Sequence, residues 1–174
     1  MALSGSTSTN ISAHTKLVFV WTAVQSVSAW HSTISWELQL QTDSVGNIQA
    51  TSESPNTVTI DGQTFADAAN IGIGTNETKT LESGQITLEH DAEGNRSFEY
   101  SFSQVCNITI MDVGYVGTVT GSGVGELDKL STGTEEPETP EEPDTSAILQ
   151  RKRTFVYFYL LGRCCRFHAI GGES

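Results

Sequence analysis

Histidine is the residue best suited to acid–base or metal chemistry near neutral pH, and this chain has four histidines spread along its length. They are His14, His31, His90 and His168, and no two have the i, i+4 spacing that brings imidazoles together on one helix face. His90 precedes Asp91 at the end of a predicted strand, which would suit a metal-binding or pH-sensitive role. A solvent-exposed turn residue is the favoured interpretation, so the sequence predicts no metal site and no cofactor.

The cysteines indicate no disulfide framework, because their number is odd and Cys164 and Cys165 are adjacent. These two thiols and His168 could ligate a soft metal, but a structural site needs four ligands on a rigid frame. With Cys106 as the third cysteine, the pattern is typical of a chain made in a reducing cytoplasm.

Acidic side chains cluster near His90, where Glu89 with Asp91 or Glu93 could form a glycosidase-like carboxylate pair. A solvated acidic turn is the simpler interpretation of this cluster. The sequence has no Gly-x-Ser-x-Gly elbow, no Walker loop and no Rossmann fingerprint. We therefore predict that the protein is not an enzyme and has no catalytic residues.

Tryptophan offers a different chemistry, the stacking of an aromatic ring on a sugar. Trp21 and Trp36 fall on the inward faces of predicted strands, where they would belong to the core. Trp30 lies in a connection beside His31 and is free to present its ring to a ligand. Trp30 and His31 are therefore the candidate ligand-binding residues.

The element expected to organise the chain is a hairpin over residues 81–102. Both arms alternate apolar and polar residues with the period of two that is typical of strands. The residues expected to share the inner face are Ile86, Leu88, His90, Phe98, Tyr100 and Phe102. Residues 91–95 supply an aspartate, a glycine and an asparagine, which favour a turn. The two arms are predicted to pair as antiparallel strands.

Further short strands occur at regular spacing on both sides of this hairpin. Residues 34–41 have the cleanest alternation, with Ile34, Trp36, Leu38 and Leu40 directed inward. Asp61-Gly62 predicts a two-residue hairpin turn. Glycine at every other position near residue 123 predicts either a neighbouring aromatic ring or close backbone packing. Seven or eight strands predict an all-β, antiparallel β-sandwich over residues 1–130, Ig-like or jelly-roll-like, with a closed barrel as the rival.

The charge of the chain limits its partners. A formal net charge of −12 would repel a polyanion, so no nucleic acid is expected to bind. The first residues lack a basic region and an apolar stretch, so no secretory signal is expected.

The composition changes after the predicted sandwich. Residues 131–147 form an acidic run punctuated by prolines, which predicts a disordered linker. In the C-terminal tail, residues 148–174, an aromatic run with basic flanks spans residues 151–162. The run is too short for a transmembrane segment. An extra strand, a short helix or an altered C-terminus is favoured over an anchor at the membrane surface.

Five segments carry a resemblance to a known family: residues 3–6, 21–29, 58–65, 81–98 and 125–128. Together they resemble the N-terminal domain of siphovirus minor structural proteins, a family of uncharacterised function in phages and prophages of Gram-positive bacteria. The most specific element is the segment from Ser83 to Phe98, although Asp91 and Glu93 stand where the family pattern has Asn and Asp. The acidic link after residue 130 also departs from the basic link of the family.

The resemblance implies a virion protein made in the bacterial cytoplasm, a component of the tail tip, baseplate or fibre that acts as scaffold or host-adhesion module. Its partners would be other virion proteins and copies of itself, since phage fibres are often threefold assemblies. Two alternatives remain open: a carbohydrate-binding module for host cell-wall glycans that uses Trp30, and an accessory domain of a cell-wall hydrolase.

Overall fold

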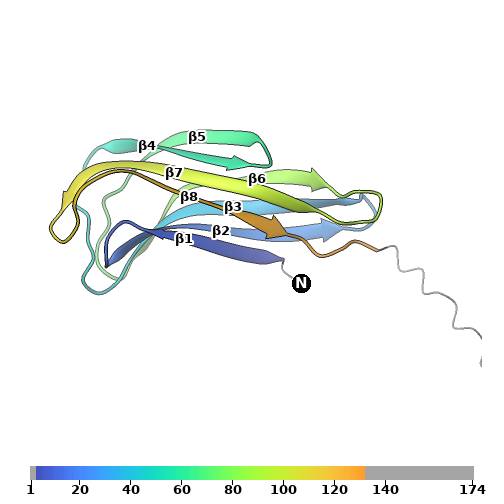
Figure 1. The fold of residues 1–174 in the computed structure, drawn as a ribbon, viewed down its shortest axis with the longest axis horizontal. Coiled ribbons are helices and arrows are strands. Elements are labelled where there is room, and N and C mark those ends of the chain that lie inside the picture. Colours follow the sequence, from blue (N-terminus) through green and yellow to red (C-terminus); the bar gives the residue numbers. More distant parts are fainter. Residues whose placement is uncertain (1–2, 132–174) are drawn as a thin grey trace, which may run out of the picture. The chain divides into compact units, whose positions relative to one another are not determined.

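The computed structural model describes residues 3–131, and these residues form two antiparallel four-stranded sheets without any helix (Figure 1). The strands are β1 (Ser4–Asn10), β2 (Thr15–Ser26), β3 (His31–Thr42), β4 (Glu53–Ile60), β5 (Gln63–Asn70), β6 (Thr78–Glu89), β7 (Ser97–Ile110) and β8 (Gly114–Glu126). One sheet has the order β1-β2-β3-β6 and the other has the order β5-β4-β7-β8. The prediction of an all-β protein built from two antiparallel sheets is therefore confirmed.

Strand β3 shows how the alternation of the sequence builds the core. Ile34, Trp36, Leu38 and Leu40 are all buried, while the residues between them are partly exposed on the outer face. In the neighbouring strand β2, Phe19 lies opposite Leu38 and Trp21 lies opposite Trp36. Both tryptophans are therefore core residues, as predicted.

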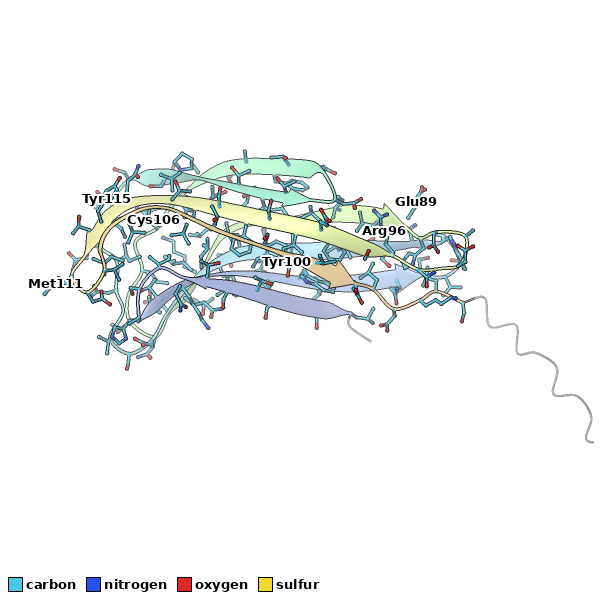
Figure 2. The ribbon with its side chains drawn as sticks, in the orientation of Figure 1. Glu89, Arg96, Tyr100, Cys106, Met111 and Tyr115 are labelled. Atoms are coloured by element: carbon cyan, nitrogen blue, oxygen red, sulfur yellow. The ribbon has the colours of Figure 1, made fainter. Side chains whose placement is uncertain are left out.

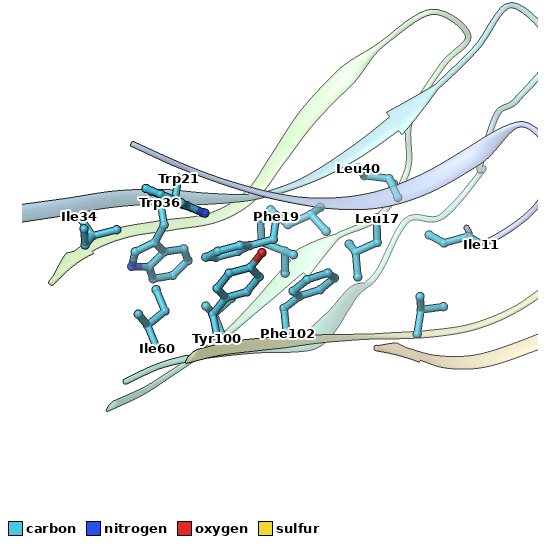
Figure 3. Close-up of a cluster of buried hydrophobic side chains, with 14 of the residues drawn as sticks. Ile11, Leu17, Phe19, Trp21, Ile34, Trp36, Leu40, Ile60, Tyr100 and Phe102 are labelled. Carbon is cyan, nitrogen blue, oxygen red and sulfur yellow. The ribbon is translucent and has the colours of Figure 1, made fainter. Parts of the chain in front are cut away.

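Aromatic rings from both sheets meet in the centre of the core (Figure 3). Phe19 stacks on Tyr100 and Phe102 of the opposite sheet, with ring centroids 4.6 and 5.7 Å apart. Trp21 meets Phe98 edge to face at 5.1 Å. Each such pair adds about 0.5–1.5 kcal/mol to the stabilisation from buried area, so these contacts join the two sheets.

Glycines of β8 make room for these rings. A Cβ atom at Gly121, Gly123 or Gly125 would collide with the ring of Phe102, Tyr100 or Phe98, respectively. Of the two alternatives predicted for the alternating glycines, the structure shows the aromatic rings.

The turn between β4 and β5 also agrees with the sequence. Ile60 pairs with Gln63, which leaves a two-residue loop. Asp61 and Gly62 have φ angles of 50° and 81°, the left-handed conformation that a type I′ turn requires at both positions.

The hairpin predicted over residues 81–102 is wrong. Strand β6 pairs with β3, whereas β7 pairs with β4 and β8 in the other sheet. The turn-forming residues 91–95 do reverse the chain, but the connection carries it from one sheet to the other. The predicted alternation of buried and exposed residues in both arms is correct, because each sheet buries one face against the same core. Leu88 of β6 and Phe98 of β7 are both buried in that core.

Several sequence predictions lie outside the described residues. They concern the linker at 131–147, the tail at 148–174 with its aromatic run, and the group of Cys164, Cys165 and His168. Within the part of the chain that the structure describes, no helix is long and apolar enough to cross a membrane.

Candidate functional site

Trp30, the predicted sugar-stacking residue, occupies the turn between β2 and β3. It has a φ angle of 55° and is partly buried. Its ring nitrogen Nε1 donates a hydrogen bond of 2.7 Å to the carbonyl oxygen of Asp91. The amide of His90 donates to the carbonyl of Trp30 at 3.1 Å. Trp30 therefore joins its own turn to the β6–β7 connection, and only part of its surface remains accessible to a ligand.

His31, the second predicted site residue, is the first residue of β3 and lies opposite Glu89 of β6. It is partly buried. The structure thus places both candidate residues at the same end of the sandwich, close to the acidic residues of the connection.

The prediction that His90 is a solvent-exposed turn residue is wrong. The side chain is 7% exposed and forms two hydrogen bonds. Its Nε2 lies 2.7 Å from the hydroxyl of the buried Ser32, and its Nδ1 donates to the carbonyl of Gly94 at 2.8 Å. The alternation of the strand correctly placed His90 on the inner face, but the local pattern does not reveal that its imidazole links β3 to the β6–β7 connection.

The segment that follows β8 completes this end. The amide of Leu130 donates to the carbonyl of Gly94 at 2.8 Å, and the amide of Leu127 donates to the carbonyl of Arg96 at 3.0 Å. Gly94 has a φ angle of 84°, and a Cβ atom there would collide with the carbonyl of Leu130. We call residues 27–30, 90–96 and 127–130 together the hydrogen-bonded end.

Asp91 is the acidic residue that stabilises the turn at the hydrogen-bonded end. The Asp91 carboxylate accepts hydrogen bonds from the amides of Asn95 at 2.7 Å and Glu93 at 3.1 Å. The bond from Asn95 is the main reason why the pKa of Asp91 is lowered. Arg96 forms an ion pair with Asp61 in the β4–β5 turn. Asp91 is therefore committed to holding the loop, and Glu89 and Glu93 beside it are exposed.

The opposite end of the sandwich presents apolar side chains to solvent. Met111 is fully exposed, and Tyr115, Val45 and Val113 are 70%, 62% and 51% exposed. They lie on the loop after β3 and on the β7–β8 hairpin. Figure 2 shows Met111 and Tyr115 at the end of the sandwich far from Arg96 and Glu89. We call Val45, Met111, Val113 and Tyr115 together the apolar end.

A groove of about 530 Å³ adjoins the apolar end. Its apolar walls include Ile48, Ile108 and Ile110, and its polar groups include His14 and Asp112. The groove lies between the loop after β1, the loop after β3 and the end of β7. Apolar walls with a few polar groups are typical of surfaces that bind a partner.

Asp43 shapes the loop on one side of this groove. Its carboxylate accepts a hydrogen bond from His14 Nδ1 at 2.8 Å and from the amides of Val45 and Gly46 at 2.8 and 3.0 Å. These bonds, led by that from His14, lower the pKa of Asp43 to about 2. The ionised carboxylate thus fixes the conformation that exposes Val45.

An irregularity in the pairing of β7 with β8 shapes the other side of the groove. The pairing of β7 with β8 shifts register between Val105 and Ile108, and Asn107 has a φ angle of 48°. Such a bulge bends a hairpin and turns its side chains. The hydroxyl of Tyr115 donates to Oδ1 of Asn107 at 2.9 Å, which holds the exposed ring in place.

Sequence reasoning missed the apolar end because its residues come from two segments that are distant in the sequence. One signal was available: residues 111–113 place Met111 and Val113 in a tight connection between strands, where polar residues are usual.

Comparisons with known protein families, with curated proteins and with solved structures find no match to this chain. Within residues 3–131, no three histidine, cysteine or acidic side chains are grouped in a way that could hold a metal ion. The one cysteine in this range, Cys106, is buried in the core, and burial raises the pKa of its thiol.

Proposed function

We propose that this protein is a non-catalytic structural component of a phage or prophage virion. It acts in the tail tip, baseplate or fibre as a scaffold or host-adhesion module, and the apolar end contacts a neighbouring virion protein. The observation that carries the proposal is the exposure of Val45, Met111, Val113 and Tyr115 beside an apolar groove. The resemblance to siphovirus minor structural proteins supports the phage context and the location in the tail.

The energetics favour a partner at this end. Covering an exposed apolar side chain contributes about 25 cal/mol per Å² of buried area. Side chains that are grouped on two loops can be covered by one partner surface, and their loops are already ordered by Asp43 and by the Tyr115–Asn107 hydrogen bond. A preorganised surface loses less conformational entropy on binding.

The strand order supports the Ig-like alternative for the fold. In immunoglobulin constant-type domains one sheet contains strands A, B, E and D, and the other contains C, F and G. With β2, β3 and β6 as A, B and E, and with β4, β7 and β8 as C, F and G, six strands keep this order; strand D has no counterpart beside β6, and β1 and β5 are added at the other edges. We therefore favour an Ig-like over a jelly-roll-like sandwich.

Purification of particles tests the proposed function. Particles induced from a strain that carries the gene should contain the protein after density-gradient purification, as detected by mass spectrometry. A deletion strain complemented with Val45→Ser and Met111→Ser should release particles with at least a tenfold lower content of the protein. Val24→Ser is the matched control, because Val24 is 73% exposed on a sheet face. Absence of the wild-type protein from purified particles would refute the proposal.

A carbohydrate-binding module is the second candidate, because the turn fixes the partly exposed Trp30 ring through its Nε1 hydrogen bond. A ring held in one orientation is suited to stacking on a sugar. Wild-type protein should then bind fragments of host cell-wall glycan on an array, and Trp30→Ala should not. An array on which wild-type protein gives only background signal excludes this candidate.

A further inference from the structure

Strands β1 and β8 lie on the same side of the sandwich. Each is an edge strand of its sheet. The Thr9 hydroxyl of β1 donates a hydrogen bond of 3.0 Å to the carbonyl of Thr120 in β8. Thr7 of β1 forms a hydrogen bond with the hydroxyl of Tyr100 in β7. We call residues 4–10 and 116–125 together the β1/β8 side.

The β1/β8 side carries no charged residue, although the chain has a formal net charge of −12. Strands β5 and β6 form the opposite edges, and they carry Asp67, Lys79, Glu82 and Glu89. Two copies of such an acidic protein repel each other through most of their surface. The β1/β8 side is the region where two copies can approach with the least electrostatic cost.

Strand β8 is neither short nor marked by lysine or proline, although Thr9 of β1 contacts its outer edge. Edge strands commonly contain lysine or proline, or are very short, because their free backbone groups can pair with another chain. β8 has 13 residues and reaches its first charged residue only at Glu126. Its outward side chains, Thr118, Thr120, Ser122 and Val124, are exposed, and all except Ser122 are β-branched. This composition favours strand pairing.

The inner face of β8 is already occupied, since its glycines pack against the aromatic rings of β7. A partner strand would therefore pair with the backbone N–H and C=O groups on the outer edge of β8. The Thr120 carbonyl already accepts the Thr9 hydroxyl from outside its own sheet. A carbonyl oxygen has two lone pairs, so the Thr9 bond leaves it able to accept a second hydrogen bond from a partner strand.

We propose that β8 pairs in antiparallel orientation with β8 of a second copy of this chain, across a twofold axis near Gly121. This register places Thr120 opposite Ser122 and Thr118 opposite Val124, so hydroxyl and β-branched side chains meet across the axis. The pairing joins two four-stranded sheets into one continuous sheet. It goes beyond the proposed function, because it does not involve the apolar end and can fail independently of it.

Sedimentation of the full chain tests this pairing. Wild-type protein should have about twice the monomer mass of 18.8 kDa at high concentration and should dissociate on dilution. Thr120→Lys with Ser122→Lys places like charges opposite each other across the axis, and this variant should remain monomeric. Thr64→Lys with Ala66→Lys, on the exposed edge strand β5, is the matched control and should dimerise like wild type.

Covalent trapping keeps the proposal testable if the lysine variant fails to fold. In a Cys164→Ser and Cys165→Ser background, Thr120→Cys with Ser122→Cys should form a disulfide-linked dimer on mild oxidation, since opposite residues of paired strands are close enough to bridge. The corresponding cysteines at Thr64 and Ala66 should not. A monomeric wild-type chain, a lysine variant that dimerises like wild type, or equal trapping on β5 and β8 would each overturn the proposal.

Discussion

The two ends of the sandwich use their loops in opposite ways. At the hydrogen-bonded end, the loops bond to one another through Trp30, His90 and Gly94, and the segment after β8 closes over them. At the apolar end, local bonds from Asp43 and Asn107 order each loop, and apolar side chains remain exposed. The hydrogen-bonded end therefore contributes mainly to stability, whereas the apolar end has surface available for binding.

The difference also separates the candidate functions. The glycan candidate depends on Trp30, which lies in the end devoted to stability. The virion-contact proposal depends on residues that contribute little to the core. A substitution can therefore affect one end of the sandwich without changing the other.

Substitution of Gly94 is expected to cause the largest loss of stability. Gly94→Ala should destabilise the domain by about 3 kcal/mol, because alanine at positive φ is strained and its Cβ collides with the Leu130 carbonyl. Gly62→Ala is the control: Gly62 has a similar φ of 81°, but no atom lies within 4 Å of the added Cβ. Gly62→Ala should lower the free energy of unfolding by about 1 kcal/mol. Urea unfolding followed by tryptophan fluorescence measures both. Equal losses would show that the segment after β8 is not tightly held.

A smaller effect is expected from Ser32. Ser32→Ala removes the hydroxyl partner of the buried His90 Nε2 and should destabilise the domain by about 1–2 kcal/mol. Ser44→Ala, in the exposed loop near the apolar end, should change the stability by less than about 0.5 kcal/mol. The same urea measurement compares the two variants. Similar values for both would contradict the division of roles between the ends.

The smallest effect concerns pH at the apolar end. The pKa of Asp43 is about 2 in the folded protein, below its ordinary value of 3.8. A lowered folded-state pKa gives a stabilising contribution that is present above pH 4 and is lost as the pH falls towards 2. Below pH 4 the amides of Val45 and Gly46 should therefore lose protection in hydrogen exchange, measured as the observed rate relative to the intrinsic rate at the same pH. Asp43→Asn should remove this pH dependence, and its persistence in that variant would assign it to another group.

Much of the fold could be predicted because each successful signal depends on short-range geometry. Alternation fixed which face of β3 is buried, as Trp36 and Leu38 show. The Asp61-Gly62 pair specified a turn that only residues tolerant of positive φ can form. The alternating glycines left one face of the strand bare, and the rings of β7 fill that space.

The errors arose where the outcome depends on distant contacts. Residues 91–95 predict a reversal of direction, but turn chemistry does not determine whether the next strand joins the same sheet. His90 is buried by Ser32, which is 58 residues away. The apolar end combines Val45 with Met111, and no local pattern relates these two positions.

The crossing between β6 and β7 has a consequence for synthesis on the ribosome. The sheet of β1, β2 and β3 stays incomplete until β6 has left the exit tunnel, and β4 and β5 emerge while β3 still has a bare edge. A nascent chain that stops at Arg96 would contain the strands of one complete sheet, but Phe19 would lack its ring partners Tyr100 and Phe102, because β7 would not yet exist. Such intermediates are prone to aggregation, so slow translation after β6 has left the tunnel and before β7 has left it would reduce the yield of folded protein.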